Sequence, residues 1–134
     1  MKPFTLDSSM TTMSGVFYPT GHVVVMLPGR DTVDKAVHAL QEAGMSGDDI
    51  SLLSPEIIHG QIARTVGNAD MPLPSAGTEA DTVRRFAELA SQGHWGLMVH
   101  APGGRESDKV MDALRGMPVA YAQRYGKLVI EDLA

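Results

Sequence analysis

The chain has 134 residues, 11 Lys and Arg against 16 Asp and Glu, a formal net charge of −5 at pH 7, and no cysteine. This length is typical of one domain with its own core, and the acidic balance argues against a nucleic-acid surface. The lack of cysteine excludes disulfides and thiolate metal sites, and no segment approaches the roughly 20 apolar residues of a membrane span, so we expect a cytoplasmic protein that binds neither nucleic acid nor membrane.

The first 20 residues mix Ser, Thr, Met and Pro without a period, which predicts an irregular arm outside the core. Only the segment Gly15-Val16-Phe17-Tyr18 is expected to dock onto the rest of the protein. The domain division is therefore an arm over residues 1–20 and a single α+β domain over residues 21–134.

A strand-helix-strand unit follows the arm. The β-branched run from His22 to Leu27 predicts a central strand, and Asp31 or Thr32 can cap the helix after it. The apolar residues of that helix recur at helical spacing and end before Gly44, and Ile50 to Leu53 predicts the next strand. The expected core face of the helix consists of Val33, Ala36, Val37 and Leu40.

The second half of the chain repeats the first. Gly21-His22 is matched by Gly93-His94 at an offset of 72 residues, and Asp34-Lys35 by Asp108-Lys109 at an offset of 74. A two-residue insertion between strand and helix produces this change of offset, so the pattern indicates a duplication. Further matches are Met26 with Met98, Pro28-Gly29 with Pro102-Gly103, and Ala39-Leu40 with Ala113-Leu114.

In the second copy, alternation predicts a strand over Trp95 to Val99, and Ser107 or a neighbour is expected to cap the next helix. Two more strands are predicted, over Val119 to Tyr125 and Leu128 to Glu131. Between the copies, Ser54-Pro55-Glu56 indicates a short helix, residues 68–77 a linker, and residues 78–92 a longer helix with Val83, Phe86, Ala87 and Ala90 on one face.

Two such units side by side predict an α+β ferredoxin-like sandwich, here with inserted helices and an extra C-terminal strand. The alternative is a small doubly wound α/β fold, which results if the helix over residues 78–92 is a crossover between parallel strands.

The chain also resembles the bacterial heat-induced general stress protein domain over roughly residues 21–125. The resemblance is carried by Val23-Val24-Val25-Met26, Ala39-Leu40, Gly44-Met45, Asp48 to Leu53, Phe86-Ala87-Glu88-Leu89, Gly93 and Leu97-Met98-Val99. It implies a small cytoplasmic, stress-associated domain and transfers no catalytic motif. The arm and residues 68–77 lie outside the family pattern.

One face of the sheet is the first candidate site. Strand alternation places His22 and Met26 with His94, Met98 and His100 on a face too apolar for open solvent, so something should cover it. A second subunit is the leading expectation, which makes the protein a homodimer. A ligand or metal pocket is the alternative, although His22 and His94 can lie at opposite ends, and His94 and His100 are too far apart along one strand to share an ion.

The two strand-to-helix turns are the second candidate site. Each places Gly, Arg and free amides at a helix N-terminus, which attracts anions, although neither matches a phosphate-loop fingerprint. The residues concerned are Arg30, Thr32, Gly104, Arg105 and Ser107.

The sequence contains no nucleophile-elbow motif and specifies no catalytic residue, metal ligand set or cofactor. We therefore expect a non-enzymatic, stress-associated module that dimerises through its sheet face. The alternative is a phosphate-, nucleotide- or metal-binding protein that uses the Gly-Arg turns or the His/Met face.

Overall fold

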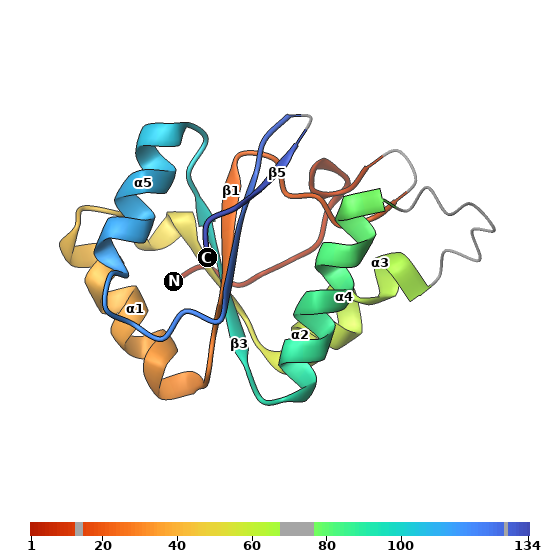
Figure 1. Ribbon diagram of the computed structural model, residues 1–134, viewed down its shortest axis with the longest axis horizontal. Helices are drawn as coiled ribbons and strands as arrows, with labels where there is room; N and C mark the ends of the chain where they lie inside the picture. Colours follow the sequence, from red (N-terminus) through yellow and green to blue (C-terminus); the bar gives the residue numbers. More distant parts are fainter. Residues whose placement is uncertain (13–14, 68–76, 128) are drawn as a thin grey trace.

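The computed structural model describes residues 1–12, 15–67, 77–127 and 129–134. A five-stranded sheet in the order β2-β3-β1-β4-β5 separates two layers of helices (Figure 1). The strands are β1 (His22–Leu27), β2 (Ile50–Leu53), β3 (Trp95–His100), β4 (Tyr121–Tyr125) and β5 (Ile130–Asp132). Helices α1 (Arg30–Glu42) and α5 (Gly104–Ala113) cover one face; α2 (Pro55–Ile57), a π-helical turn η3 (Ile58–Ile62), α3 (Arg64–Gly67) and α4 (Gly77–Ser91) lie on the other.

This is the predicted α+β ferredoxin-like sandwich with an insertion and an added strand. The central strands β1 and β3 are antiparallel neighbours, with His22 opposite His100 and Leu27 opposite Trp95. The doubly wound alternative is wrong, because β2 and β3 are antiparallel although α4 lies between them in the chain. The inserted helices return the chain to the same end of the sheet instead of crossing it over.

Both main helices begin earlier than the capping residues predicted. Gly29 and Gly103 occupy the N-cap positions with extended backbones, so Asp31 and Thr32 lie in the first turn of α1 and Ser107 lies inside α5. The Ser107 hydroxyl donates to the Gly104 carbonyl at 3.0 Å. Side-chain capping was the wrong expectation, since these two caps use glycine, which the N-cap position also accepts.

Glycines at matched positions precede the two central strands. Gly21 has φ of 80° and Gly93 has φ of 92°, a left-handed conformation that favours glycine. The duplication itself stays a prediction, and these two conformations agree with it.

Other element boundaries shift by a few residues. Ser54 caps α2 as predicted, its Oγ accepting the Ile57 N–H at 3.2 Å. The strand predicted from Val119 begins at Tyr121, and the last strand is Ile130–Asp132. Of the predicted linker over residues 68–77, only Gly77 is described, and it begins α4. Leu128, the predicted start of the last strand, also lies outside the described residues.

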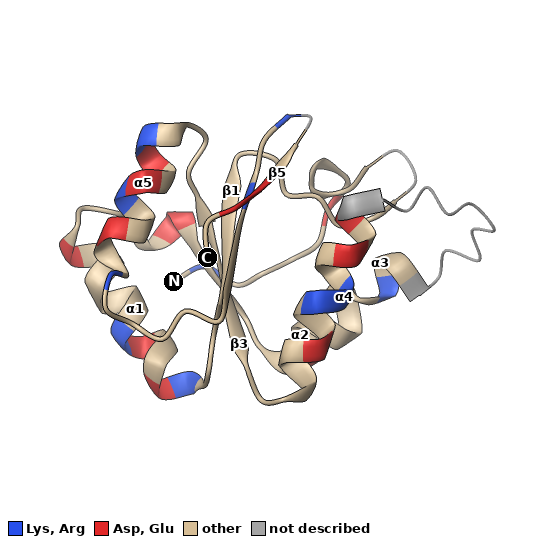
Figure 2. Cartoon of the chain, viewed as in Figure 1, with Lys and Arg blue, Asp and Glu red and all other residues tan. Residues whose placement is uncertain are grey.

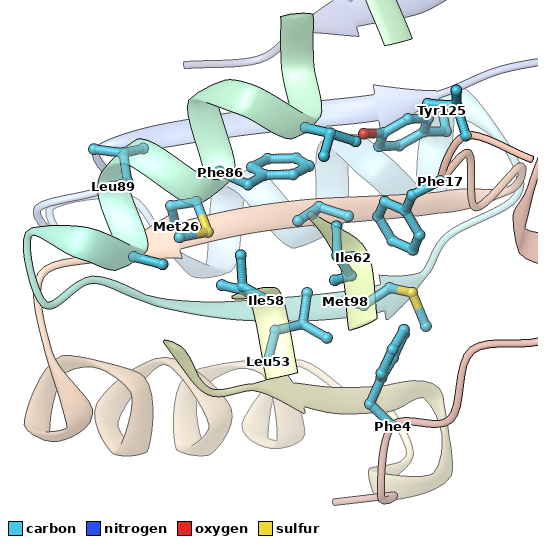
Figure 3. Packing of buried hydrophobic residues seen from close by; sticks show 14 residues of the cluster. Phe4, Phe17, Met26, Leu53, Ile58, Ile62, Phe86, Leu89, Met98 and Tyr125 are labelled. Carbon is cyan, nitrogen blue, oxygen red and sulfur yellow. The ribbon is translucent and has the colours of Figure 1, made fainter. Parts of the chain in front are cut away.

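The sheet carries a separate apolar core on each face. On the α1/α5 face, Val23, Val25 and Leu27 are fully buried against the predicted helix residues Val33, Ala36 and Leu40. On the opposite face, Val24, Met26 and Met98 pack with residues of α4 and η3 (Figure 3). The second core also contains Phe4, Val16 and Phe17 of the arm.

The arm is therefore part of the core, contrary to the expectation that it lies outside. The segment around Phe17 docks as predicted, but Phe4 is also buried, at 7% exposed. Phe17 stands edge to face with Phe4 at 6.2 Å and with Tyr125 at 6.1 Å between ring centres. The sequence gives no periodic signal of this docking, because single aromatic side chains anchor an irregular segment.

Candidate functional site

The middle of the predicted His/Met face is covered by the chain itself. Met26 is fully buried and Met98 is 2% exposed, and Figure 3 shows Phe4, Phe17, Ile58, Ile62 and Phe86 around them. The face is covered, as expected, but its middle is covered by the chain itself and not by a second subunit. An insertion and an arm of the same chain satisfy the need for cover that the apolar surface implied.

The histidines of that face separate into two places. His22 stands directly opposite His100, and their rings meet edge to face at 5.1 Å between centres. His94 precedes Trp95 at the other end of the sheet, so the suspicion that His22 and His94 lie apart is confirmed. The pairing of His22 with His100 follows from the strand register, which the sequence did not specify.

Two protein oxygen atoms lie near the imidazole pair. The Nδ1 atom of His22 lies 3.1 Å from the Thr20 carbonyl oxygen, and Nδ1 of His100 lies 3.9 Å from Oδ1 of Asp49. Burial lowers the pKa of His22, the Thr20 carbonyl opposes this, and His100 and Lys2 lower it further. His22 is therefore mainly neutral near pH 7.

A pocket of about 250 Å³ lies under the arm, and its wall includes Met98, two residues before His100 on β3. Hydrogen bonds from Lys2 N to the Ile50 carbonyl at 2.8 Å and from Leu6 N to Gln61 Oε1 at 3.3 Å hold the arm over it. Asp7 is the acidic residue of the pocket wall, and two hydrogen bonds from Ser9 lower its pKa, with a smaller contribution from the charge of His22. The pocket is lined by Lys2, Pro3, Phe4, Thr5, Asp7, Met10, Ser51 and Met98.

Ser51 is the buried polar residue of the pocket wall. It is 2% exposed and pairs with Met98 across β2 and β3. The hydrogen bonds of the described residues include none between Ser51 and either imidazole, and Asp49 is too far from His100 for a short hydrogen bond. Among the described residues, Ser51 therefore lacks the contact with a base that nucleophilic catalysis requires.

The two Gly-Arg turns lie at opposite ends of the sheet and do not form one site. Arg30 lies near Trp95, with its guanidinium 5.3 Å from the ring centre, and its Nε donates to Asp34 at 3.1 Å. The other turn follows His100, at the far end of β3. Arg30 and Arg105, each predicted to bind an anion at its own turn, are thus separated by the length of the strand.

The second turn offers little to a ligand. Ser107 is buried and bonded within its own helix. Arg105 lines an open groove of about 700 Å³ between α5 and the end of α1, where basic and acidic side chains alternate. Figure 2 shows the same mixing of signs on α1, α4 and α5. The predicted residues Thr32 and Gly104 lie in the first turns of the two helices.

Among the described residues, no three His, Asp or Glu side chains gather in a way that could hold a metal ion. In the same part of the chain, no helix has the length and apolar character needed to cross a bilayer.

Sequence reasoning missed most of the pocket. Lys2, Asp7 and Met10 belong to an arm whose docking it did not foresee, and Ser51 was treated only as part of a strand. Strand alternation was the available signal for Ser51, because the side chains of Ser51 and the buried Ile50 point to opposite faces of the sheet.

Comparison of the chain with protein-family models, with curated proteins and with solved structures finds no match. The resemblance to the general stress protein domain therefore rests on the residues quoted for it, and the assignment of function rests on the site.

Proposed function

We propose that the chain is a non-enzymatic binding module that holds a small organic molecule in the pocket under its N-terminal arm. The observation that carries the proposal is the pocket itself, in which a buried serine and two charged side chains meet four apolar ones near a pair of imidazoles. Ligand sites combine an apolar lining with a few polar groups in this way.

The size and lining of the pocket limit the ligand. At about 30 Å³ for each water-sized group, 250 Å³ accommodates about eight non-hydrogen atoms. Phe4, Met10 and Met98 suit an apolar body, and Lys2 suits an anionic or hydrogen-bonding head. A small organic acid fits this combination best.

This proposal replaces dimerisation through the sheet face. Met26 and Met98 are already packed within the chain, so a second copy has no access to them. The stress-associated, cytoplasmic setting implied by the family resemblance is compatible with ligand binding and is part of the proposal.

The test is a titration followed by ¹⁵N–¹H correlation spectra, using a panel of organic acids of about eight non-hydrogen atoms. We expect saturable shifts at Thr5, Ser51 and Met98. Ser51→Leu, which fills the pocket, should abolish them, and Arg30→Ala at the far turn should leave them unchanged.

Two results would overturn the proposal. One is a panel that produces no saturable shift at the pocket. The other is binding that responds to Arg30→Ala or Arg105→Ala and not to Ser51→Leu, which would assign the ligand to a Gly-Arg turn.

A further inference from the structure

The end of the sheet presents two imidazoles from neighbouring strands. His22 and His100 are directly paired in register, and their ring centres are 5.1 Å apart. Side chains at opposed positions of antiparallel strands have Cβ atoms about 4.5–5.5 Å apart, which makes the pair a property of the backbone and not of one side-chain conformation.

Of the two residues, only His22 has Nδ1 within hydrogen-bonding distance of a protein oxygen in the described part of the chain. The partner of His22 is the Thr20 carbonyl at 3.1 Å, and the nearest carboxylate to His100 is Asp49 at 3.9 Å. Metal-binding histidines generally direct one ring N–H to a carbonyl or carboxylate, which leaves the other nitrogen with a free lone pair. In His22 that nitrogen is Nε2, and in His100 Nε2 is the ring nitrogen that does not face Asp49.

We propose that Nε2 of His22 and Nε2 of His100 together bind one divalent transition-metal ion, with water completing its coordination. The proposal does not depend on the organic ligand of the pocket. It concerns a pair of side chains that do not line the pocket and that the sequence did not bring together.

The ring separation agrees with a shared ion. With metal–nitrogen bonds of about 2.0–2.1 Å at a tetrahedral angle, the centres of two ligating rings lie about 5.2 Å apart. The observed 5.1 Å matches this separation. The rings now meet at an interplanar angle of 62°, so one of them must turn before both lone pairs meet. The side chain of His100 is half exposed, so turning this ring disturbs less packing than turning a buried one.

The surrounding charges favour a cation. Asp7 and Asp49 contribute two negative charges near the pair, and Lys2 contributes one positive charge. Imidazole ligands suit Cu²⁺ and Zn²⁺, and the affinity of a given site is higher for Cu²⁺.

The experiment measures Cu²⁺ and Zn²⁺ binding to the full chain by isothermal titration calorimetry at about pH 7.5, where imidazole is neutral. We expect one saturable site for each metal, with tighter binding of Cu²⁺. His22→Gln and His100→Gln should each weaken binding at least about tenfold. The matched control is His38→Gln, because His38 is an exposed histidine that lies 3.0 Å from the carboxylate of Glu42.

Electron paramagnetic resonance of the Cu²⁺ form adds a readout that does not require a variant. Two imidazole nitrogens should couple to the copper in the unaltered chain, and one in His100→Gln. A single coupled nitrogen in the unaltered chain would overturn the proposal, and so would affinity that both variants leave unchanged. Failure here leaves the pocket titration unaffected, because that titration contains no metal.

Discussion

Phe17→Ala tests whether the arm belongs to the cooperative fold. The Phe17 side chain is fully buried and contacts two aromatic rings edge to face, Phe4 and Tyr125. Truncation of a buried Phe costs about 3–5 kcal/mol, and the two ring contacts place this residue in the upper half of that range. The loss is a large share of the 5–15 kcal/mol that is typical of a domain.

The assay is urea unfolding followed by far-UV circular dichroism and by Trp95 fluorescence. Trp95 packs with the core of the opposite sheet face, so both signals should shift together if the arm and the two cores unfold as one unit. Val129→Ala is the control, because Val129 is 58% exposed and should change the free energy of unfolding by less than about 0.5 kcal/mol. A loss below about 1 kcal/mol by Trp95 fluorescence for Phe17→Ala would refute the reasoning, since the buried arm would then contribute nothing to the core.

Three further predictions concern single positions. Gly96→Ala should cost about 1–3 kcal/mol in chemical denaturation, because the added Cβ would lie 3.1 Å from the sulfur of a methionine, whereas Gly60→Ala has open space and should not destabilise to this extent. Tyr125→Phe should raise the melting temperature, since the buried hydroxyl has no partner among the described residues, and Tyr18→Phe should lower it by losing a 2.7 Å bond worth about 1 kcal/mol. Because burial lowers the pKa of His22, the unfolded chain binds more protons below about pH 6.5. The stability contributed by neutral His22 is full above that pH and is lost as the pH falls through the lowered pKa. The melting temperatures at about pH 8 and about pH 5 should therefore differ less in His22→Gln than in the unaltered chain. An equal difference in the two proteins would contradict the assignment.

The elements with strong periodicity were predictable from the sequence. The run from His22 to Leu27, the helix stripe containing Val33 and Leu40, and the alternation around Leu97 all gave correct elements, because each is a local pattern of burial. The helix starts were less predictable, since Gly29 competed with Asp31 and Thr32 for the same cap position. The site was the least predictable part.

The pocket depends on contacts between segments far apart in the chain. Strand alternation places His22, His100 and Met98 on one face, but it does not specify the register that sets His22 opposite His100. Nor could it place Lys2 and Asp7 near that pair, because the arm docks through isolated aromatic residues without a repeating pattern.

The sequence alone determined two strand-helix-strand units and an apolar sheet face that needed cover. The reason is that the alternation of apolar residues along each strand is a local pattern. Only the tertiary structure decided what provides the cover. The inserted helices and the arm bury Met26 and Met98 within one chain, and they leave the imidazole pair at the edge of that cover. The physical reason is that an apolar surface specifies burial without specifying a partner, and the hydrophobic effect has no direction of its own.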